Sequence, residues 1–207
     1  MNENVDSIDL AVSGESNVER DGLLYAIVDR EQQMFINVRS QTPASCQQNI
    51  PAFRIHRLSQ LCPWSEATLA SYLTDLQRAQ NQQQNLMQKK YALMEQGRSC
   101  AVPVGLDEIV ALQIIWQQEL LEKYPQLEGQ GRELDRDDAS NTSFKTYLLG
   151  ELRTFSTATL SLLYKDMLAC QARGENWNEL ILLATIRYQR LDEKGSDHDG
   201  QTSFDVD

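Results

Sequence analysis

Histidine and cysteine are scarce in this 207-residue chain, and their scarcity argues against several kinds of site. The two histidines, His56 and His198, are too few for the paired Glu-x-x-His motifs of a ferritin-like di-iron centre. The four cysteines never form a Cys-x-x-Cys pair, which argues against a zinc cluster or a thioredoxin-like redox pair. We assign no metal ligand and leave the cofactor undefined, and an oxygen-only site for a magnesium-like ion stays open.

Long hydrophobic runs are also missing. No stretch approaches the roughly 18 apolar residues of a membrane span, and the first residues do not form a secretory signal. The chain has no Gly-rich phosphate loop, Gly-x-Ser-x-Gly elbow or His-Glu-x-x-His motif, so the common nucleotide, hydrolase and zinc-protease classes lack their parts. We expect a cytoplasmic protein with no membrane partner.

The net charge of −11 is concentrated at the two ends of the chain. Residues 1–21 carry six acidic residues against one arginine, and residues 191–207 carry six against one lysine. The remaining body is nearly neutral, which argues against nucleic-acid binding. We expect disordered acidic tails at 1–20 and 192–207 around one helical domain at 21–191, with a partner-binding tail as the alternative.

Apolar residues recur every three or four positions, the spacing typical of amphipathic helices. Residues 80–84, rich in Gln and Asn, are either a connection or a continuing helix. We predict an all-α, single-domain bundle of about six to seven helices with flexible acidic termini. The expected helices cover about residues 23–39, 53–61, 65–79, 86–96, 107–124, 142–171 and 176–191.

Three glutamates fall on apolar helix faces, where an unpaired carboxylate costs free energy. They are Glu31, Glu119 and Glu151. Gly150 removes a side chain in mid-helix, which suggests that a neighbouring helix or ligand comes close. The carboxylates either bind a polar ligand or are neutralised as structural ion pairs by Arg57, Lys90 or Arg153.

Cys46 precedes a predicted helix, and a helix N-terminus lowers the pKa of a thiol. With His56 as base it would form a nucleophilic pair, and the simpler interpretation is a cysteine without chemistry. Aromatic residues at helical spacing form either core or the wall of a pocket. They are Trp64, Tyr72, Tyr91, Trp116, Tyr124 and Tyr147.

As a set, these residues resemble an uncharacterised bacterial and fungal family, domain of unknown function 4125. The resemblance covers about residues 24–190 and includes Glu31, Met34-Phe35, Val38, Ala44-Ser45-Cys46-Gln47, Phe53, Ser59-Gln60, Trp64, Ser71-Tyr72-Leu73, Asp75-Leu76, Asn85-Leu86, Lys90-Tyr91-Ala92, Met94, Trp116, Lys123-Tyr124-Pro125, Gly131-Arg132, Thr142-Ser143-Phe144, Thr146-Tyr147-Leu148 and Gly150-Glu151-Leu152.

The resemblance implies a helical domain whose recurring polar residues look like a site, and it implies no known reaction. The chain departs from the family pattern in two places. Gln41-Thr42-Pro43 replaces the usual Gly-Gly-Arg, and Lys145 replaces a glutamate. Either departure is consistent with an altered or lost family activity.

Our leading hypothesis is an internal polar site that binds or transforms a small polar metabolite, as an accessory biosynthetic step. Buried glutamates with raised pKa would hold or deprotonate the ligand, and Lys90 or Arg132 would receive an anionic group. The alternative is a non-catalytic protein-interaction module whose partner is undefined. The expected catalytic residues are Glu31, Cys46, Glu119 and Glu151, and the expected ligand-binding residues are Gln47, Trp64, Lys90, Tyr91, Trp116, Arg132 and Tyr147.

Overall fold

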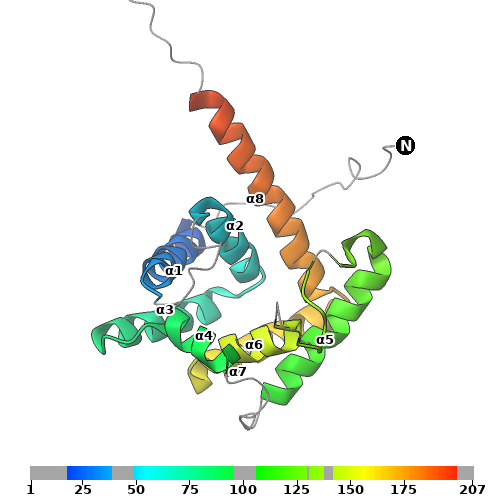
Figure 1. The fold of residues 1–207 in the computed structure, drawn as a ribbon, viewed down its shortest axis with the longest axis horizontal. Coiled ribbons are helices and arrows are strands. Elements are labelled where there is room, and N and C mark those ends of the chain that lie inside the picture. Colours follow the sequence, from blue (N-terminus) through cyan, green and yellow to red (C-terminus); the bar gives the residue numbers. More distant parts are fainter. Residues whose placement is uncertain (1–17, 39–48, 96–105, 130, 138–141, 200–207) are drawn as a thin grey trace, which may run out of the picture.

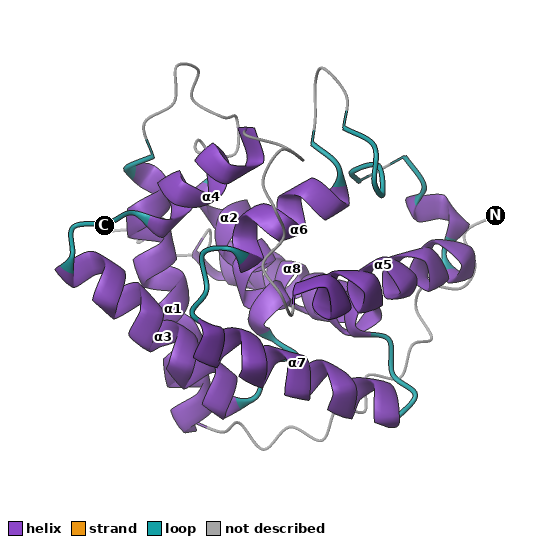
Figure 2. Ribbon diagram, turned by 90° about the horizontal axis from the view of Figure 1, so that it is seen from below, coloured by secondary structure: helices purple, strands orange, loops and turns teal. Residues whose placement is uncertain are grey.

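The computed structural model describes residues 18–38, 49–95, 106–129, 131–137 and 142–199. This part of the chain is all-α, as predicted, and Figure 2 shows helices and loops in it without a strand. No helix in it is both long and apolar enough to cross a membrane. The helices are α1 (Val18–Ile36), α2 (Ile50–Leu61), α3 (Glu66–Asn81), α4 (Leu86–Glu95), α5 (Leu106–Lys123), the 3-10 helix η3 (Pro125–Leu127), α6 (Phe144–Leu152), α7 (Thr157–Ala172) and α8 (Trp177–Asp199).

The two halves of the chain form one bundle (Figure 1). In the N-terminal half, α1 packs against α2, α3 and α4. Each of these three partners also contacts a helix of the C-terminal half, because α2 packs on α8, α3 on α7 and α4 on α6. Side chains from α1, α2, α3, α4 and α6 therefore meet in the interior.

Several predicted helix boundaries are wrong. The first helix was expected at about 23–39, and α1 instead runs from Val18, within the expected N-terminal tail, to Ile36. The single helix expected at about 142–171 is divided into α6 and α7, so the described residues contain eight α-helices instead of six to seven. The last helix was expected to end near Leu191 and continues to Asp199, which includes the first residues assigned to the C-terminal tail. The connection at 80–84 is a turn, since α3 ends at Asn81 and Gln83 has a φ of 56°.

The division between α6 and α7 follows from an N-terminal capping sequence, Ser-x-x-Thr. The Ser156 hydroxyl accepts from the Thr159 N–H at 3.3 Å, and Asp75 of α3 accepts from Ser156 N and Thr159 Oγ1 at 2.9 and 2.7 Å. These bonds satisfy N–H groups that a helix leaves without intrahelical partners. A new helix therefore begins at this point.

The same device begins α3. Ser65 caps the Thr68 N–H, and Asp166 of α7 accepts from Ser65 N at 2.9 Å and Thr68 Oγ1 at 2.6 Å. Asp75 of α3 in turn caps α7, so the two helices hold each other's N-termini with a reciprocal pair of carboxylates. A carboxylate near a helix N-terminus is favourable, because it faces the positive end of the helix dipole. The pairing fixes α3 against α7.

Candidate functional site

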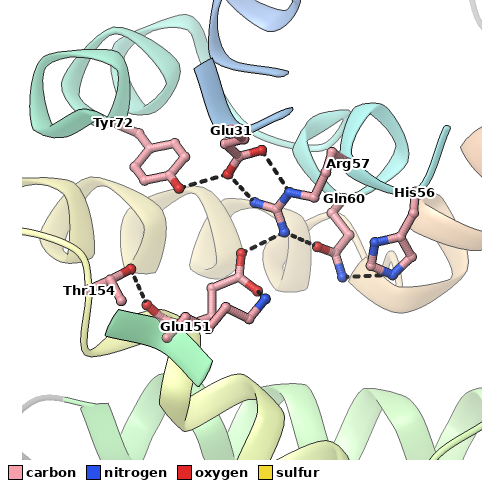
Figure 3. A network of polar contacts seen from close by, with 8 residues as sticks. Glu31, His56, Arg57, Gln60, Tyr72, Glu151 and Thr154 are labelled. Carbon is pink, nitrogen blue, oxygen red and sulfur yellow. Dashed lines mark hydrogen bonds and ion pairs between the residues drawn. The ribbon is translucent and has the colours of Figure 1, made fainter. Parts of the chain in front are cut away.

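A buried ion pair joins α1 to α2 at the centre of the site (Figure 3). Arg57 donates from Nε to Glu31 Oε2 at 2.8 Å and from Nη2 to Glu31 Oε1 at 2.6 Å. The Tyr72 hydroxyl, from α3, donates to Glu31 Oε1 at 2.7 Å. The side chains of Arg57 and Glu31 are only 2% and 0% exposed. Glu31 is therefore inward-facing, as the apolar stripe of α1 predicted.

Glu151 extends this network to α4 and α6. Arg57 Nη1 donates to Glu151 Oε1 at 2.7 Å, and Lys90 Nζ donates to Glu151 Oε2 at 2.8 Å. A Cβ at Gly150 would lie 2.6 Å from Met94 Cγ and 3.2 Å from the Lys90 carbonyl oxygen. The glycine thus lets α6 approach α4 until Lys90 reaches Glu151. The close approach predicted at Gly150 is confirmed, and the neighbour is a helix.

The contacts determine the protonation states of the network. Burial alone would raise the pKa of Glu151, but the charges of Arg57 and Lys90 lower that pKa well below its usual value. Burial and the adjacent Glu31 carboxylate raise the pKa of Tyr72 well above its usual value. At neutral pH Glu151 is ionised and Tyr72 is protonated. Glu151 therefore does not have the raised pKa that we expected of a carboxylate base.

Arg57 acts mainly as a structural connector. Of its five N–H groups, Glu31 accepts two, while Glu151 and Gln60 accept one each. Burial alone would lower the pKa of Arg57, but Glu151 and Glu31 raise it well above its usual value. Arg57 and Lys90 thus neutralise two of the three predicted glutamates, which favours the ion-pair interpretation of Glu31 and Glu151.

Lys90 and a further cation, Arg132, both lie over the ring of Tyr147. Lys90 Nζ is 3.8 Å from the centroid of the Tyr147 ring, and the Arg132 guanidinium carbon is 4.7 Å from the same centroid. Arg132 also donates from Nη1 to the Thr142 carbonyl and hydroxyl oxygens, both at 2.7 Å. Cations over an aromatic face are attracted by its quadrupole. Tyr147 therefore holds two positive charges close together.

These cations line an open pocket of about 880 Å³. Its walls come from α1, α2, α4, α5 and α6 together with the loop before α6. The ring of Phe35 stacks on that of Phe53 with centroids 4.4 Å apart and forms an apolar wall. The described lining residues are Phe35, Asn49, Ala52, Phe53, His56, Arg57, Gln60, Met87, Lys90, Tyr91, Gln117, Gly131, Arg132, Phe144 and Tyr147.

The pKa of His56 is shifted by the charges around this pocket. Burial by surrounding atoms and the positive charges of Arg57, Lys90 and Arg132 lower the pKa of His56 to about 4. His56 is nevertheless accessible to solvent, and hydration reduces the effect of burial on its pKa. Of the two causes of the lowered pKa, the nearby positive charges therefore tell more about the surroundings of His56. The Glu151 carboxylate opposes them and raises the pKa, but the net shift is downward, so the imidazole is uncharged at neutral pH.

Most of the predicted ligand-binding residues in the described part of the chain lie in or beside this pocket. Lys90, Tyr91, Arg132 and Tyr147 line it, and Trp64 lines a smaller pocket next to it. Trp116 instead stacks on Trp177 in the core, with centroids 6.3 Å apart. Cys46 and Gln47 lie outside the described residues. Where side chains are described, no three of His, Cys, Asp or Glu gather as a metal site.

The prediction that Glu119 faces inward is wrong. Its side chain is exposed, and its Oε2 accepts from Asn176 Nδ2 at 3.0 Å. The buried stripe of α5 contains Gln113, Trp116 and Leu120, and Glu119 lies about 100° around the helix from Leu120. Glu119 is therefore separate from the network of Glu31 and Glu151.

The polar face of α2 was predicted only in part. Arg57 was expected only as one of several counter-ions and His56 only as a base, and no role was predicted for Gln60. The three residues lie within about one turn, and His56 Nε2 is 3.3 Å from Gln60 Nε2. Their spacing beside the buried Leu58 and Leu61 was a signal for a polar site.

Fold and site together define an all-α single-domain protein with a buried ion-pair network behind a cationic pocket. The chain belongs to the family described as "Protein of unknown function (DUF4125)", which matches residues 21–194. This match confirms the resemblance seen in the sequence. No curated protein and no solved structure matched the chain.

Proposed function

We propose that this protein binds a small organic anion in the pocket of about 880 Å³. The observation that carries the proposal is the charge of the lining. Among the described residues, Arg57, Lys90 and Arg132 line the pocket, and no aspartate or glutamate does. Hydrogen bonds from charged donors to a carboxylate or phosphate are about twice as strong as neutral ones.

The two buried carboxylates offset the charge of Arg57 and Lys90, but they also fix the positions of these cations. Neither Glu31 nor Glu151 lines this pocket, although Glu151 lines the smaller pocket beside it. Their oxygens are engaged by Arg57, Lys90 and Tyr72. They hold the inner cations in fixed positions. A preorganised charge loses little freedom when the ligand binds, which favours affinity.

Arg132 is the cation best placed to contact the ligand directly. Lys90 is only 3% exposed and is anchored by Glu151, so it contributes mainly to the local potential. Arg132 is half-buried, whereas Arg57 and Lys90 are buried, and its guanidinium carbon is 4.7 Å from the centroid of the Tyr147 ring. A guanidinium presents N–H groups in the geometry that matches a carboxylate or phosphate.

The size of the pocket and its aromatic wall favour a metabolite over an inorganic ion. Ligand pockets typically measure about 300 to 1,000 Å³ and combine apolar walls with a few polar groups. The Phe35 and Phe53 rings and Tyr91 supply the apolar part here. The proposal concerns binding, because ionised Glu151 and protonated Tyr72 are poorly suited to remove or donate a proton.

A thermal-shift screen of organic acids, phosphate esters and nucleotides tests the proposal. A ligand at about 100 times its dissociation constant adds roughly 2.7 kcal/mol to the free energy of unfolding. For a domain of this size that stabilisation corresponds to an increase in Tm of about 5 to 10 °C. We expect the Tm increase in the wild type and its loss in Arg132→Gln.

Arg136→Gln is the matched control. Arg136 is an exposed residue of the same loop and does not line the pocket. Its substitution makes the same change in net charge as Arg132→Gln. The control should keep the full Tm increase. An equal loss in both variants would reduce the effect to net charge, and flat curves for all anions would favour the protein-interaction alternative.

A further inference from the structure

A second pocket of about 270 Å³ adjoins the cationic pocket. Five side chains line both pockets and therefore form their common border. They are Arg57, Gln60, Gln117, Phe144 and Tyr147. The cationic pocket lies on the side of Lys90 and Arg132, and the second pocket lies on the side of α7 and α8.

The second pocket is mainly apolar. Its deeper wall consists of aromatic and aliphatic side chains from four of the helices and the α2–α3 and α6–α7 connections. They are Trp64, Leu120, Leu148, Leu152, Phe155, Leu163, Trp177, Ile181 and Leu182. Such a surface gains free energy when an apolar group replaces water on it.

Three polar groups of this pocket, one of them charged, are already engaged with the protein. Glu151 lines the pocket, and its two carboxylate oxygens accept from Arg57 and Lys90. Asn178 Nδ2 donates to the Gln113 carbonyl oxygen at 3.2 Å and to Gln117 Oε1 at 2.9 Å. The Thr185 hydroxyl donates to the Ile181 carbonyl oxygen at 2.9 Å. A polar ligand group would have to displace these bonds, whereas an apolar group would not.

We infer that the ligand is an amphipathic organic anion, with its acidic group at Arg132 and its apolar part in the pocket beyond Tyr147. This inference rests on the proposed function and specifies the class of anion. A cavity of about 150 Å³ accommodates a benzene molecule. The second pocket, at about 270 Å³, therefore has room for a ring with a substituent or for a short aliphatic chain.

The dependence of affinity on chain length tests this inference in the wild-type protein. Dissociation constants are measured by calorimetry for acetate, butyrate, hexanoate and octanoate. Affinity should rise by up to about fourfold for each added methylene group, as expected for full burial, until the pocket is filled. Affinity that does not change along the series would overturn the inference.

A pair of variants locates the apolar part of the ligand. Leu182 of α8 lines the second pocket and is only partly exposed, so Leu182→Phe places extra volume inside it. Leu180→Phe adds the same volume at a partly exposed position of α8 that lines neither pocket. We expect Leu182→Phe to weaken octanoate binding at least tenfold while leaving butyrate unchanged, and Leu180→Phe to leave both unchanged.

The outcomes separate the inference from the proposed function. If short carboxylates bind and Arg132→Gln weakens them, but longer chains gain nothing, the anion site stands and the apolar extension is wrong. If no carboxylate of any length binds, the inference is wrong, and the anion site is wrong as well if the phosphate esters and nucleotides of the screen also fail to bind. If Leu182→Phe does not fold, the wild-type series still decides, because the gain per methylene group does not depend on a variant.

Discussion

Arg57 and Glu31 form a two-bond ion pair from which water is almost entirely excluded, with N–O distances of 2.6 and 2.8 Å. The same guanidinium reaches Glu151 at 2.7 Å, so one side chain compensates carboxylates from α1 and α6. A charge buried in this way is stable only while its partners are present. The site and the fold therefore depend on the same contacts.

Removing Arg57 should be strongly destabilising. Arg57→Met leaves the Glu31 carboxylate buried without its counter-ion, and we expect a loss of about 3 to 5 kcal/mol in the free energy of unfolding. The control is Arg54→Met, since Arg54 lies on the same helix and pairs with Asp29 at 2.6 Å in an exposed position. That pair should contribute about 0 to 1 kcal/mol. Urea denaturation measures both, and equal losses would contradict a buried network.

Two glycine substitutions should have opposite effects. Gly150→Ala adds a Cβ 2.6 Å from Met94 Cγ and 3.2 Å from the Lys90 carbonyl oxygen. The Met94 side chain must shift and α4 must yield slightly, at a cost of about 1 to 3 kcal/mol. Gly22 lies in α1, and a Cβ there would meet nothing within 4 Å. Gly22→Ala should stabilise the protein by up to about 1 kcal/mol, because alanine is the better helix former. Thermal unfolding compares the two, and a stabilising Gly150→Ala would contradict the close packing of α4 and α6.

His56 should make stability depend on pH in a defined window. Its pKa is about 4 in the folded protein against an ordinary value of 6.5, so between these values the unfolded chain binds more protons. Stability contributed by neutral His56 is therefore complete above about pH 6.5 and decreases as the pH falls toward 4. His56→Gln should have a smaller loss of stability across this window.

An NMR titration of the imidazole resonances measures that pKa directly. The chain has only two histidines, so the His56→Gln spectrum assigns the signal of His56 by its disappearance. A His56 ring that titrates near its ordinary pKa would contradict an electropositive pocket. If an anion binds as proposed, its negative charge should raise the pKa of His56.

The reciprocal caps predict similar losses of stability when either Asp75 of α3 or Asp166 of α7 is replaced. Asp75→Ala removes the acceptor for Ser156 N and Thr159 Oγ1, and Asp166→Ala does the same for Ser65 N and Thr68 Oγ1. We expect each to cost about 1 to 3 kcal/mol, since each leaves buried or partly buried donors without an acceptor.

Asp29→Ala is the control for these caps, because Asp29 is an exposed acid that pairs only at the surface. Chemical denaturation of the three variants should place the Asp75 and Asp166 substitutions well below the control in stability. A cost at Asp166 no larger than at Asp29 would contradict its role as a cap.

The sequence by itself determined the helical class, most helix positions and the family. Those features depend on the local spacing of apolar residues and on capping residues such as Ser65, which act within one segment of chain. The inward positions of Glu31 and Glu151 also followed, since a carboxylate inside an apolar stripe of a helix turns with that stripe. The Ser-x-x-Thr capping sequence at Ser156 is local in the same way, but it was not predicted.

Only the tertiary structure decided which charges compensate one another and where a ligand has room. Arg57 meets Glu151 across 94 positions of sequence, and Lys90 meets it across 61, so no local pattern specifies either contact. Glu119 lies outside the network because the rotation of α5 about its axis is set by packing against its neighbours. The cationic pocket exists because those long-range ion pairs hold α1, α2, α4 and α6 together, and their geometry is a property of the assembled core.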